Sequence, residues 1–244
     1  MNKIRIANFY KELCDSLEAL EFPQPVISVY NPLRYAWEGF EKYLDYSEGK
    51  KRVVFLGMNP GPWGMTQTGV PFGEVNSVKD FLGINEIHVT RPEHEHEEYP
   101  VKGLDCNKSE VSGKRLWGLF QKRYGTAEKF FAENFVLNYC PLLFLYKDAK
   151  GNVKNFTPDK FRKAHRKSLY SVCDLCLKRV VDVLAPEYVV GIGNFAEDRA
   201  LDALVELDLT VARILHPSPA SPRSNNNWAD TARKELIDAG VWEK

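Results

Sequence analysis

The chain has 244 residues, 44% of them hydrophobic and 27% charged, and its 33 lysines and arginines balance 33 aspartates and glutamates. A formal net charge of zero argues against the strongly basic composition of many nucleic-acid-binding proteins, although it leaves room for a local basic face. No signal peptide and no apolar run of roughly 18–20 residues is recognisable, so we expect an intracellular protein without membrane contact.

The first half of the chain combines segments of helical spacing with two continuous apolar runs. Helices are expected over residues 3–20, 34–47, 77–83, 113–123 and 126–132, with Ser112 as the cap of the fourth. A Pro-rich segment between the first two is expected to be an extended connector. The apolar runs predict buried strands over 52–57 and 135–139, and Pro141 ends the second.

The second half of the chain alternates helical segments with short apolar runs. A long helix is expected to start with Thr157 as its cap and Pro158 in its first turn, and to end before Pro186. Two further strands are expected, over 187–193 and 210–215. Two further helices are expected, one capped by Asn194 and one over 228–239.

These strands are continuous apolar runs rather than alternating ones, and helices separate them in sequence. That pattern is typical of an α/β protein whose parallel sheet is covered by helices on both faces. No Ser/Gly/Pro-rich or charge-dense linker divides the chain, so we expect a single domain over residues 1–244.

Two groups of residues resemble metal ligands but have simpler explanations. Cys173 and Cys176 form a C-x-x-C pair, yet they share one face of a predicted helix with apolar residues, which favours buried thiols. His94 and His96 lie in a charged segment bounded by Pro, which favours a solvated loop. We therefore expect no metal site.

The carboxyl ends of the strands are where open parallel sheets bind ligands. At the ends of three predicted strands the sequence presents a side chain that can form hydrogen bonds, namely Asn59, Asn138 and His216. The loop after the first strand contains five Gly and three Pro over residues 57–73, and it also carries Phe72. This composition suits a rigid concave surface for a flat ligand, and the nucleotide-binding and nucleophile-elbow motifs are absent from it.

The segment from His216 to Trp228 is the other unusual stretch. Three prolines between Pro217 and Pro222 restrict its conformation, and Arg223 with several asparagines follows at the start of a helix. It is interpreted either as a rigid turn before the last helix or as a contact for phosphate groups.

Four blocks of sequence, GMNPGPWGMTQTGVPFGEV, GLDCNKSEVSG, NYCPLLFL and HPSP, together resemble the single-strand-selective monofunctional uracil-DNA glycosylases of the uracil-DNA glycosylase superfamily. The blocks occur in the expected order between about residues 53 and 228. The resemblance implies a three-layer α/β/α sandwich with a central four-stranded parallel sheet. It also implies a hydrolase that flips uracil out of single- or double-stranded DNA and cleaves its glycosidic bond, without metal, cofactor or lyase activity.

The resemblance also assigns roles to residues. Asn59 corresponds to the residue that positions the attacking water, and His216 to the one that bonds the uracil oxygen beside the scissile bond. Phe72 would stack on the base and Asn138 would read its edge. The rest of the base pocket would be formed by Gly57, Met58, Gly61 and Met65. The DNA wedge would comprise Pro217, Ser218, Pro219, Ala220, Ser221, Pro222, Arg223 and Asn226.

Two details of the sequence refine this expectation. Gly61 replaces a bulky residue and would leave room beside C5 of the base, which implies activity on 5-hydroxymethyluracil and 5-formyluracil. Ala220 stands where some vertebrate members have an Arg that plugs the duplex gap, which favours single strands or mispaired sites as substrates. The protein is expected to act as a monomer, in the cytoplasm if bacterial and in the nucleus if eukaryotic.

Three alternatives stay open from the sequence. An iron–sulfur uracil glycosylase would need four suitably placed cysteines, which the spacing does not provide. A catalytically idle protein that binds damaged DNA would have the same pocket, although the presence of both Asn59 and His216 argues against loss of activity. A hydrolase of free nucleosides would have no use for the wedge.

Overall fold

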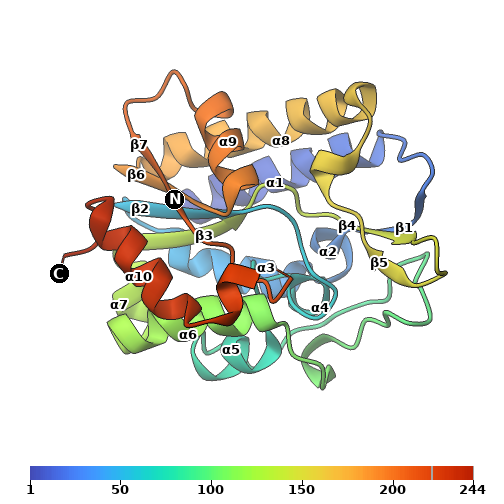
Figure 1. Ribbon diagram of the computed structural model, residues 1–244, viewed down its shortest axis with the longest axis horizontal. Coiled ribbons are helices and arrows are strands. Elements are labelled where there is room, and N and C mark those ends of the chain that lie inside the picture. The colour runs from blue at the N-terminus through green and yellow to red at the C-terminus, as the bar shows by residue number, and fades with distance from the viewer. Residues whose placement is uncertain (221, 244) are drawn as a thin grey trace.

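The computed structural model of the chain describes residues 1–220 and 222–243, without the side chains of Pro222 and Arg223 (Figure 1). Four parallel strands form its central sheet in the order β3-β2-β6-β7. They are β2 (Val53–Gly57), β3 (Asn134–Asn138), β6 (Tyr188–Ile192) and β7 (Thr210–Ile214). All residues of β2 and β3 are buried, as their continuous apolar runs predict.

Helices cover both faces of this sheet (Figure 1). One face carries α1 (Asn2–Glu18), α8 (Lys163–Leu184) and α9 (Asn194–Ala203). The other carries α3 (Trp37–Tyr43), α6 (Val111–Tyr124), α7 (Ala127–Phe131) and α10 (Trp228–Asp238). The predicted fold class, an α/β sandwich around a four-stranded parallel sheet, is thereby confirmed.

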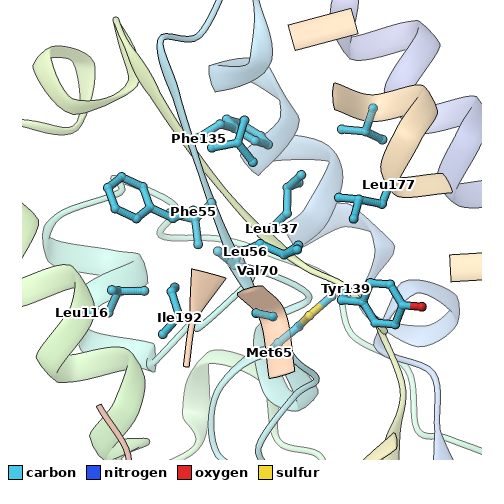
Figure 2. Close-up of a cluster of buried hydrophobic side chains, with 14 of the residues drawn as sticks. Phe55, Leu56, Met65, Val70, Leu116, Phe135, Leu137, Tyr139, Leu177 and Ile192 are labelled. Atoms are coloured by element: carbon cyan, nitrogen blue, oxygen red, sulfur yellow. The ribbon is translucent and has the colours of Figure 1, made fainter. Parts of the chain in front are cut away.

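The hydrophobic core lies on both sides of strands β2 and β3. Figure 2 shows Phe55 of β2 and Phe135 of β3 in this cluster, with Leu116 of α6 and Leu177 of α8 on opposite sides of the strands. Cys173 and Cys176 are buried on the core side of α8, so their interpretation as buried thiols is confirmed.

A second, antiparallel sheet was not predicted. It contains β1 (Val26–Tyr30), β4 (Leu143–Lys147) and β5 (Val153–Asn155) in the order β1-β4-β5. The segment expected to be an extended connector between the first two helices is extended, but it is also a sheet strand, β1, which pairs with β4 more than a hundred residues away. A pairing between such distant segments cannot be read from the local sequence, in which the flanking prolines are the most obvious feature.

Several helix boundaries also differ from the prediction. The helix expected over 34–47 is divided into α2 (Pro32–Tyr35), α3 and a 3-10 turn over Leu44–Ser47. The 77–83 helix is α5 (Val75–Asp80), whose cap is Glu74, and a one-turn helix, α4 (Met65–Thr68), was not predicted. These short elements depend on their surroundings more than on helical periodicity.

Two predicted caps were wrong, and a third caps a shorter element than expected. Ser112 is the second residue of α6 rather than its cap, and Asn194 is the first residue of α9, after Gly193. Thr157 and Pro158 start a separate 3-10 turn over Pro158–Lys160, and α8 begins only at Lys163. Ser112 and Thr157 instead face the site described below.

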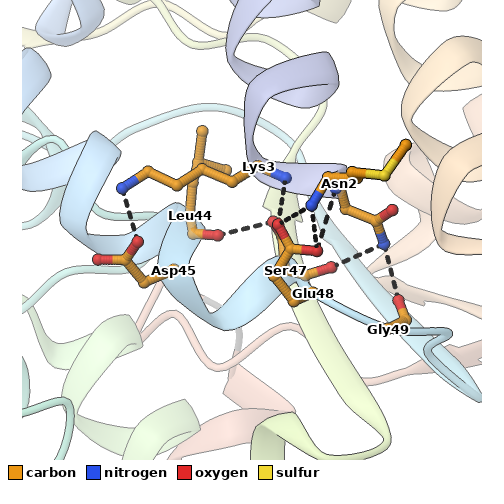
Figure 3. Close-up of polar contacts among 8 residues, drawn as sticks. Asn2, Lys3, Leu44, Asp45, Ser47, Glu48 and Gly49 are labelled. Atoms are coloured by element: carbon orange, nitrogen blue, oxygen red, sulfur yellow. Dashed lines mark hydrogen bonds and ion pairs between the residues drawn. The ribbon is translucent and has the colours of Figure 1, made fainter.

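The beginning of α1 is tied to the chain just before β2 (Figure 3). The carboxylate of Glu48 accepts hydrogen bonds from the main-chain amides of Asn2 and Lys3, each at 3.1 Å. These amides have no partner within the helix, so a carboxylate distant in sequence replaces a local cap.

Among the described residues, no helix is both long and apolar enough to cross a bilayer.

Candidate active site

A cavity of about 270 Å³ opens at the carboxyl ends of β2, β3 and β7. Its lining includes the predicted residues Met58, Asn59, Gly61, Met65, Phe72, Asn138 and His216. Four unpredicted polar residues, Glu110, Ser112, Asn155 and Thr157, line it too. Segments from five separate parts of the chain thus meet in one hollow.

Because Gly57 has no side chain, the Phe72 ring and the Asn138 amide can lie close to the end of β2. It lies opposite Asn138 in the register of β2 and β3. A Cβ atom at Gly57 would lie 2.5 Å from the Phe72 ring and 2.6 Å from Asn138 Oδ1. Gly57 therefore does not line the cavity itself, but the absence of its side chain positions two residues that do.

The Asn138 amide is buried and incompletely paired. Its side chain is at the end of β3, and the residue is only 5% exposed. Nδ2 lies 3.2 Å from the sulfur of Met65, a weak acceptor, and Oδ1 has no hydrogen-bond partner among the described residues. A buried amide oxygen without a partner is costly, which suits a group that pairs with a ligand.

Phe72 is held in a strained backbone conformation. Its φ of 53° lies in the left-handed region, which is uncommon for a bulky residue. Its carbonyl oxygen accepts hydrogen bonds from Trp117 Nε1 at 3.2 Å and from the Glu74 amide at 2.7 Å. A Cβ atom at Gly113 would come within 2.1 Å of the same oxygen. The surrounding structure therefore imposes the main-chain conformation of Phe72, which lines the cavity.

The His216 imidazole has a defined protonation state. The main-chain amide of Ser218 donates a hydrogen bond to its Nδ1 at 3.1 Å, which places the proton of the neutral ring on Nε2. Burial lowers the pKa of His216 to about 4, so the ring is neutral at pH 7. Gly193, with a φ of 90°, leaves space for the ring, because a Cβ atom there would lie 3.1 Å from His216 Cβ.

The Asn59 amide is oriented by groups on the second sheet and its neighbourhood. Its Nδ2 donates hydrogen bonds to the Leu142 carbonyl at 3.1 Å and to Asn155 Oδ1 at 3.4 Å. Asn155 in turn donates to the Pro60 carbonyl at 3.0 Å. Because Nδ2 is occupied, Asn59 Oδ1 is the atom left to accept a hydrogen bond in the cavity. Asn155 ends β5 and had no recognisable signal in the sequence.

Glu110 changes the explanation for Gly61. A Cβ atom at Gly61 would lie 2.3 to 2.7 Å from the carboxyl atoms of Glu110, so this side chain occupies the space that the glycine leaves. The carboxyl accepts a hydrogen bond from the Trp63 amide at 3.1 Å, and burial raises the pKa of Glu110. The expected free space beside Gly61 is thus a polar wall. Glu110 was not predicted as a site residue, and the only hint of its place was that it lies within the block GLDCNKSEVSG.

The loop after His216 is cross-linked by its own polar groups. Pro217 is buried and its carbonyl accepts a hydrogen bond from Arg115 at 2.8 Å, whereas Pro219, Ala220 and Asn226 are exposed. The Ala220 amide donates to the Ser218 hydroxyl at 3.2 Å, and Asn225 donates to the Pro219 carbonyl at 3.0 Å. Ser221 and the side chains of Pro222 and Arg223 lie outside the described residues.

The histidines of the predicted solvated loop take no part in the cavity. His94 is exposed, and His96 Nδ1 accepts a hydrogen bond from the Glu98 amide at 3.2 Å. Within the described part of the chain, no group of three or more potential metal-ligating side chains is found.

The sequence matches a known family over most of its length. The family model described as the uracil DNA glycosylase superfamily matches residues 44–237. A protein of Rattus norvegicus named single-strand selective monofunctional uracil-DNA glycosylase is 49% identical over 228 residues, which cover 92% of this chain and 80% of that protein. A protein of Bos taurus with the same name is 47% identical over 232 residues, 94% of this chain and 84% of its own.

The fold is also similar to that of a solved structure. The crystal structure of wild-type SMUG2 from Pedobacter heparinus aligns with a TM-score of 0.65 over 97% of this chain and 95% of that one. With 18% sequence identity, this likeness concerns the fold alone.

Proposed function

Because this chain belongs to the uracil DNA glycosylase superfamily, we propose that it is a monofunctional DNA glycosylase, a hydrolase that excises uracil from DNA by cleaving its N-glycosidic bond without lyase activity. The observation that carries this proposal is the meeting of Asn59, Phe72, Asn138 and His216 in one cavity. The reaction would leave an abasic site and so begin base excision repair.

Recognition of the base is assigned to Phe72 and Asn138. An extruded uracil would stack on the fixed Phe72 ring, which contributes about 1–3 kcal/mol and offsets part of the cost of flipping. The unpaired Oδ1 of Asn138 would accept the N3–H of uracil, and Nδ2 would leave the Met65 sulfur to donate to O4. Cytosine has the opposite pattern at these two positions, so both contacts would fail.

Departure of the base is assigned to His216. As the glycosidic bond breaks, negative charge develops on uracil O2. The neutral imidazole, with Nδ1 occupied by the Ser218 amide, would direct its Nε2–H at that oxygen. A preorganised donor of this kind acts most strongly where charge appears in the transition state.

Attack by water is assigned to Asn59. Its free Oδ1 would accept a hydrogen bond from the water molecule, while Leu142 and Asn155 hold the amide in place. An amide is a very poor base, so this residue would act by positioning the water next to an already cationic sugar.

The range of bases is proposed to include 5-hydroxymethyluracil and 5-formyluracil. The part of the cavity formed by Gly61 and the Glu110 carboxyl has a polar wall, which supports polar substituents at C5 better than the methyl group of thymine.

Both single- and double-stranded DNA are proposed as substrates, with single strands preferred. The exposed residues Pro219, Ala220 and Asn226 would form the wedge that fills the gap left by the extruded nucleotide. Ala220 is too small to fill that gap alone, which supports the preference for unpaired sites.

The test is base release from labelled oligonucleotides that contain uracil, 5-hydroxymethyluracil, thymine or cytosine, in single- and double-stranded form. The wild type would be compared with Asn59→Ala and His216→Ala, and with His94→Ala as a control histidine on an exposed loop. We expect release of uracil and 5-hydroxymethyluracil only, uncut abasic strands, and a large loss in the first two variants. Binding of these strands without release of any base would instead identify a damage-binding protein.

A further inference from the structure

Positive charge is concentrated in one segment of this neutral chain. Residues 147–167 contain eight lysines and arginines and two aspartates, a net charge of +6. The remaining 223 residues must therefore carry a net charge of −6. Such asymmetry in a chain of zero net charge indicates a surface for a polyanion.

These charges belong to one continuous segment of the chain. The segment runs from the end of β4 through β5 and the 3-10 turn Pro158–Lys160 into the first turns of α8 (Figure 1). The basic side chains Lys147, Lys150, Lys154, Lys160, Arg162, Lys163 and Lys167 are exposed.

Few of these charges are neutralised by the protein itself. Lys154 forms an ion pair with Asp148 at 2.5 Å. Arg166 donates a hydrogen bond to the Asp159 carbonyl oxygen at 3.2 Å, not to its carboxylate. Among the described residues, the other basic side chains of the segment form no ion pair within 4.0 Å. They are free to meet an external anion.

The same segment forms part of the candidate active site. Asn155 and Thr157, which lie between Lys154 and Lys160 in sequence, line the cavity. Asn155 also holds Asn59 through a hydrogen bond of 3.4 Å. The basic surface therefore begins at the rim of the cavity and continues outward along the chain.

We propose that residues 147–167, the basic surface, bind the sugar–phosphate backbone of the DNA strand beside the extruded nucleotide. This inference rests on the proposed function and adds a backbone contact separate from the 217–226 wedge. Phosphate contacts depend on charge rather than on base sequence, and they place a strand without reading it. A surface that binds the backbone of one strand would also suit this protein, because Ala220 in the proposed wedge is too small to fill the duplex gap alone.

The test compares a variant that lacks three positive charges of the basic surface with a control variant that lacks three positive charges elsewhere. The variant Lys160→Gln/Lys163→Gln/Lys167→Gln acts on the basic surface. The control is Lys50→Gln/Lys122→Gln/Lys129→Gln, whose lysines are exposed and form no ion pair among the described residues. They precede β2 or lie on α6 and α7, toward the amino end of the sheet and away from the cavity. Circular dichroism checks that both proteins are folded.

The first measurement is the affinity for a uracil-free 20-nucleotide single strand over a range of salt concentrations. Each phosphate contact contributes about 0.7 to the slope of log affinity against log salt for single strands. The basic-surface variant should lower the magnitude of this slope by about 2, and the control variant should leave it as in the wild type. Equal slopes for the two variants would overturn the proposal.

The second measurement compares kcat/KM for uracil release from a 20-nucleotide strand and from a trinucleotide, which is too short to follow the surface. The ratio of the two values should fall roughly tenfold or more in the basic-surface variant alone. An unchanged ratio with normal release would overturn the basic surface but not the proposed function. Absence of release by the wild type would overturn the proposed function, while the salt dependence would still report on the surface.

Discussion

The main-chain amide of Ser218 donates its hydrogen bond to Nδ1 of His216, over 3.1 Å and across a single proline. This contact couples the rigid loop after β7 to the chemistry of the cavity. Because Nδ1 accepts, the only N–H of the neutral ring is at Nε2, and because burial lowers the pKa of His216 to about 4, the ring stays neutral at physiological pH. The geometry therefore supplies a neutral donor at the place where the proposed reaction develops negative charge.

Replacement of His216 should reduce the chemical step much more than substrate binding. We expect His216→Ala to lower the single-turnover rate of uracil release by roughly 10²–10³, as for other donors that stabilise a developing oxyanion. His216→Gln, whose amide still donates, should recover part of this loss. A reduction in DNA affinity with an unchanged single-turnover rate would contradict the assigned role.

Acid should destabilise the protein through the same residue. The unfolded chain binds a proton at His216 near pH 6.5, whereas the folded protein does so only near pH 4, so the unfolded state gains protons first as the pH falls. Stability should therefore decrease between pH 6.5 and 4, by roughly 3 kcal/mol from this group. Urea unfolding at several pH values would measure it, and His216→Gln should show a smaller decrease. Parallel curves for the two proteins would exclude this contribution.

The unpaired amide oxygen of Asn138 should make the cavity responsive to free uracil. We expect millimolar uracil to raise the Tm of the wild type, because it supplies the missing partner for Oδ1. Asn138→Ala should remove most of this shift and lower kcat/KM for uracil-containing DNA by about 10- to 100-fold, the cost of one to two hydrogen bonds. Differential scanning fluorimetry gives the first quantity. An equal shift in both proteins would show that uracil binds elsewhere.

The two glycines of the first loop should respond differently to alanine. In Gly57→Ala, the new methyl group would collide with the Phe72 ring and Asn138 Oδ1, so both stability and base binding should fall strongly. In Gly61→Ala, the collision is with the end of the flexible Glu110 side chain, which can move away. We expect a smaller loss of Tm there, with altered selectivity between uracil and 5-hydroxymethyluracil. A larger Tm loss for Gly61→Ala than for Gly57→Ala would contradict this interpretation.

Local signals in the sequence determined the central architecture and the main polar residues. The runs at Val53 and Phe135 are apolar at every position, so they had to be buried on both faces, and the parallel sheet followed. Asn59, Asn138 and His216 were identified because they lie at or just after the ends of such runs, where parallel sheets bind ligands. The motif resemblance then supplied their roles, which a single sequence does not contain.

Only the tertiary structure decided what surrounds those residues. The second sheet joins β1 to β4 across more than a hundred residues, and its last strand brings Asn155 to Asn59, a contact with no local pattern to announce it. Glu110 fills the space at Gly61 from a loop that is nearly fifty residues away. The protonation state of His216 likewise depends on burial and on one main-chain amide. Periodicity reports which face of an element is buried, but the partners that meet there are set by packing between distant segments.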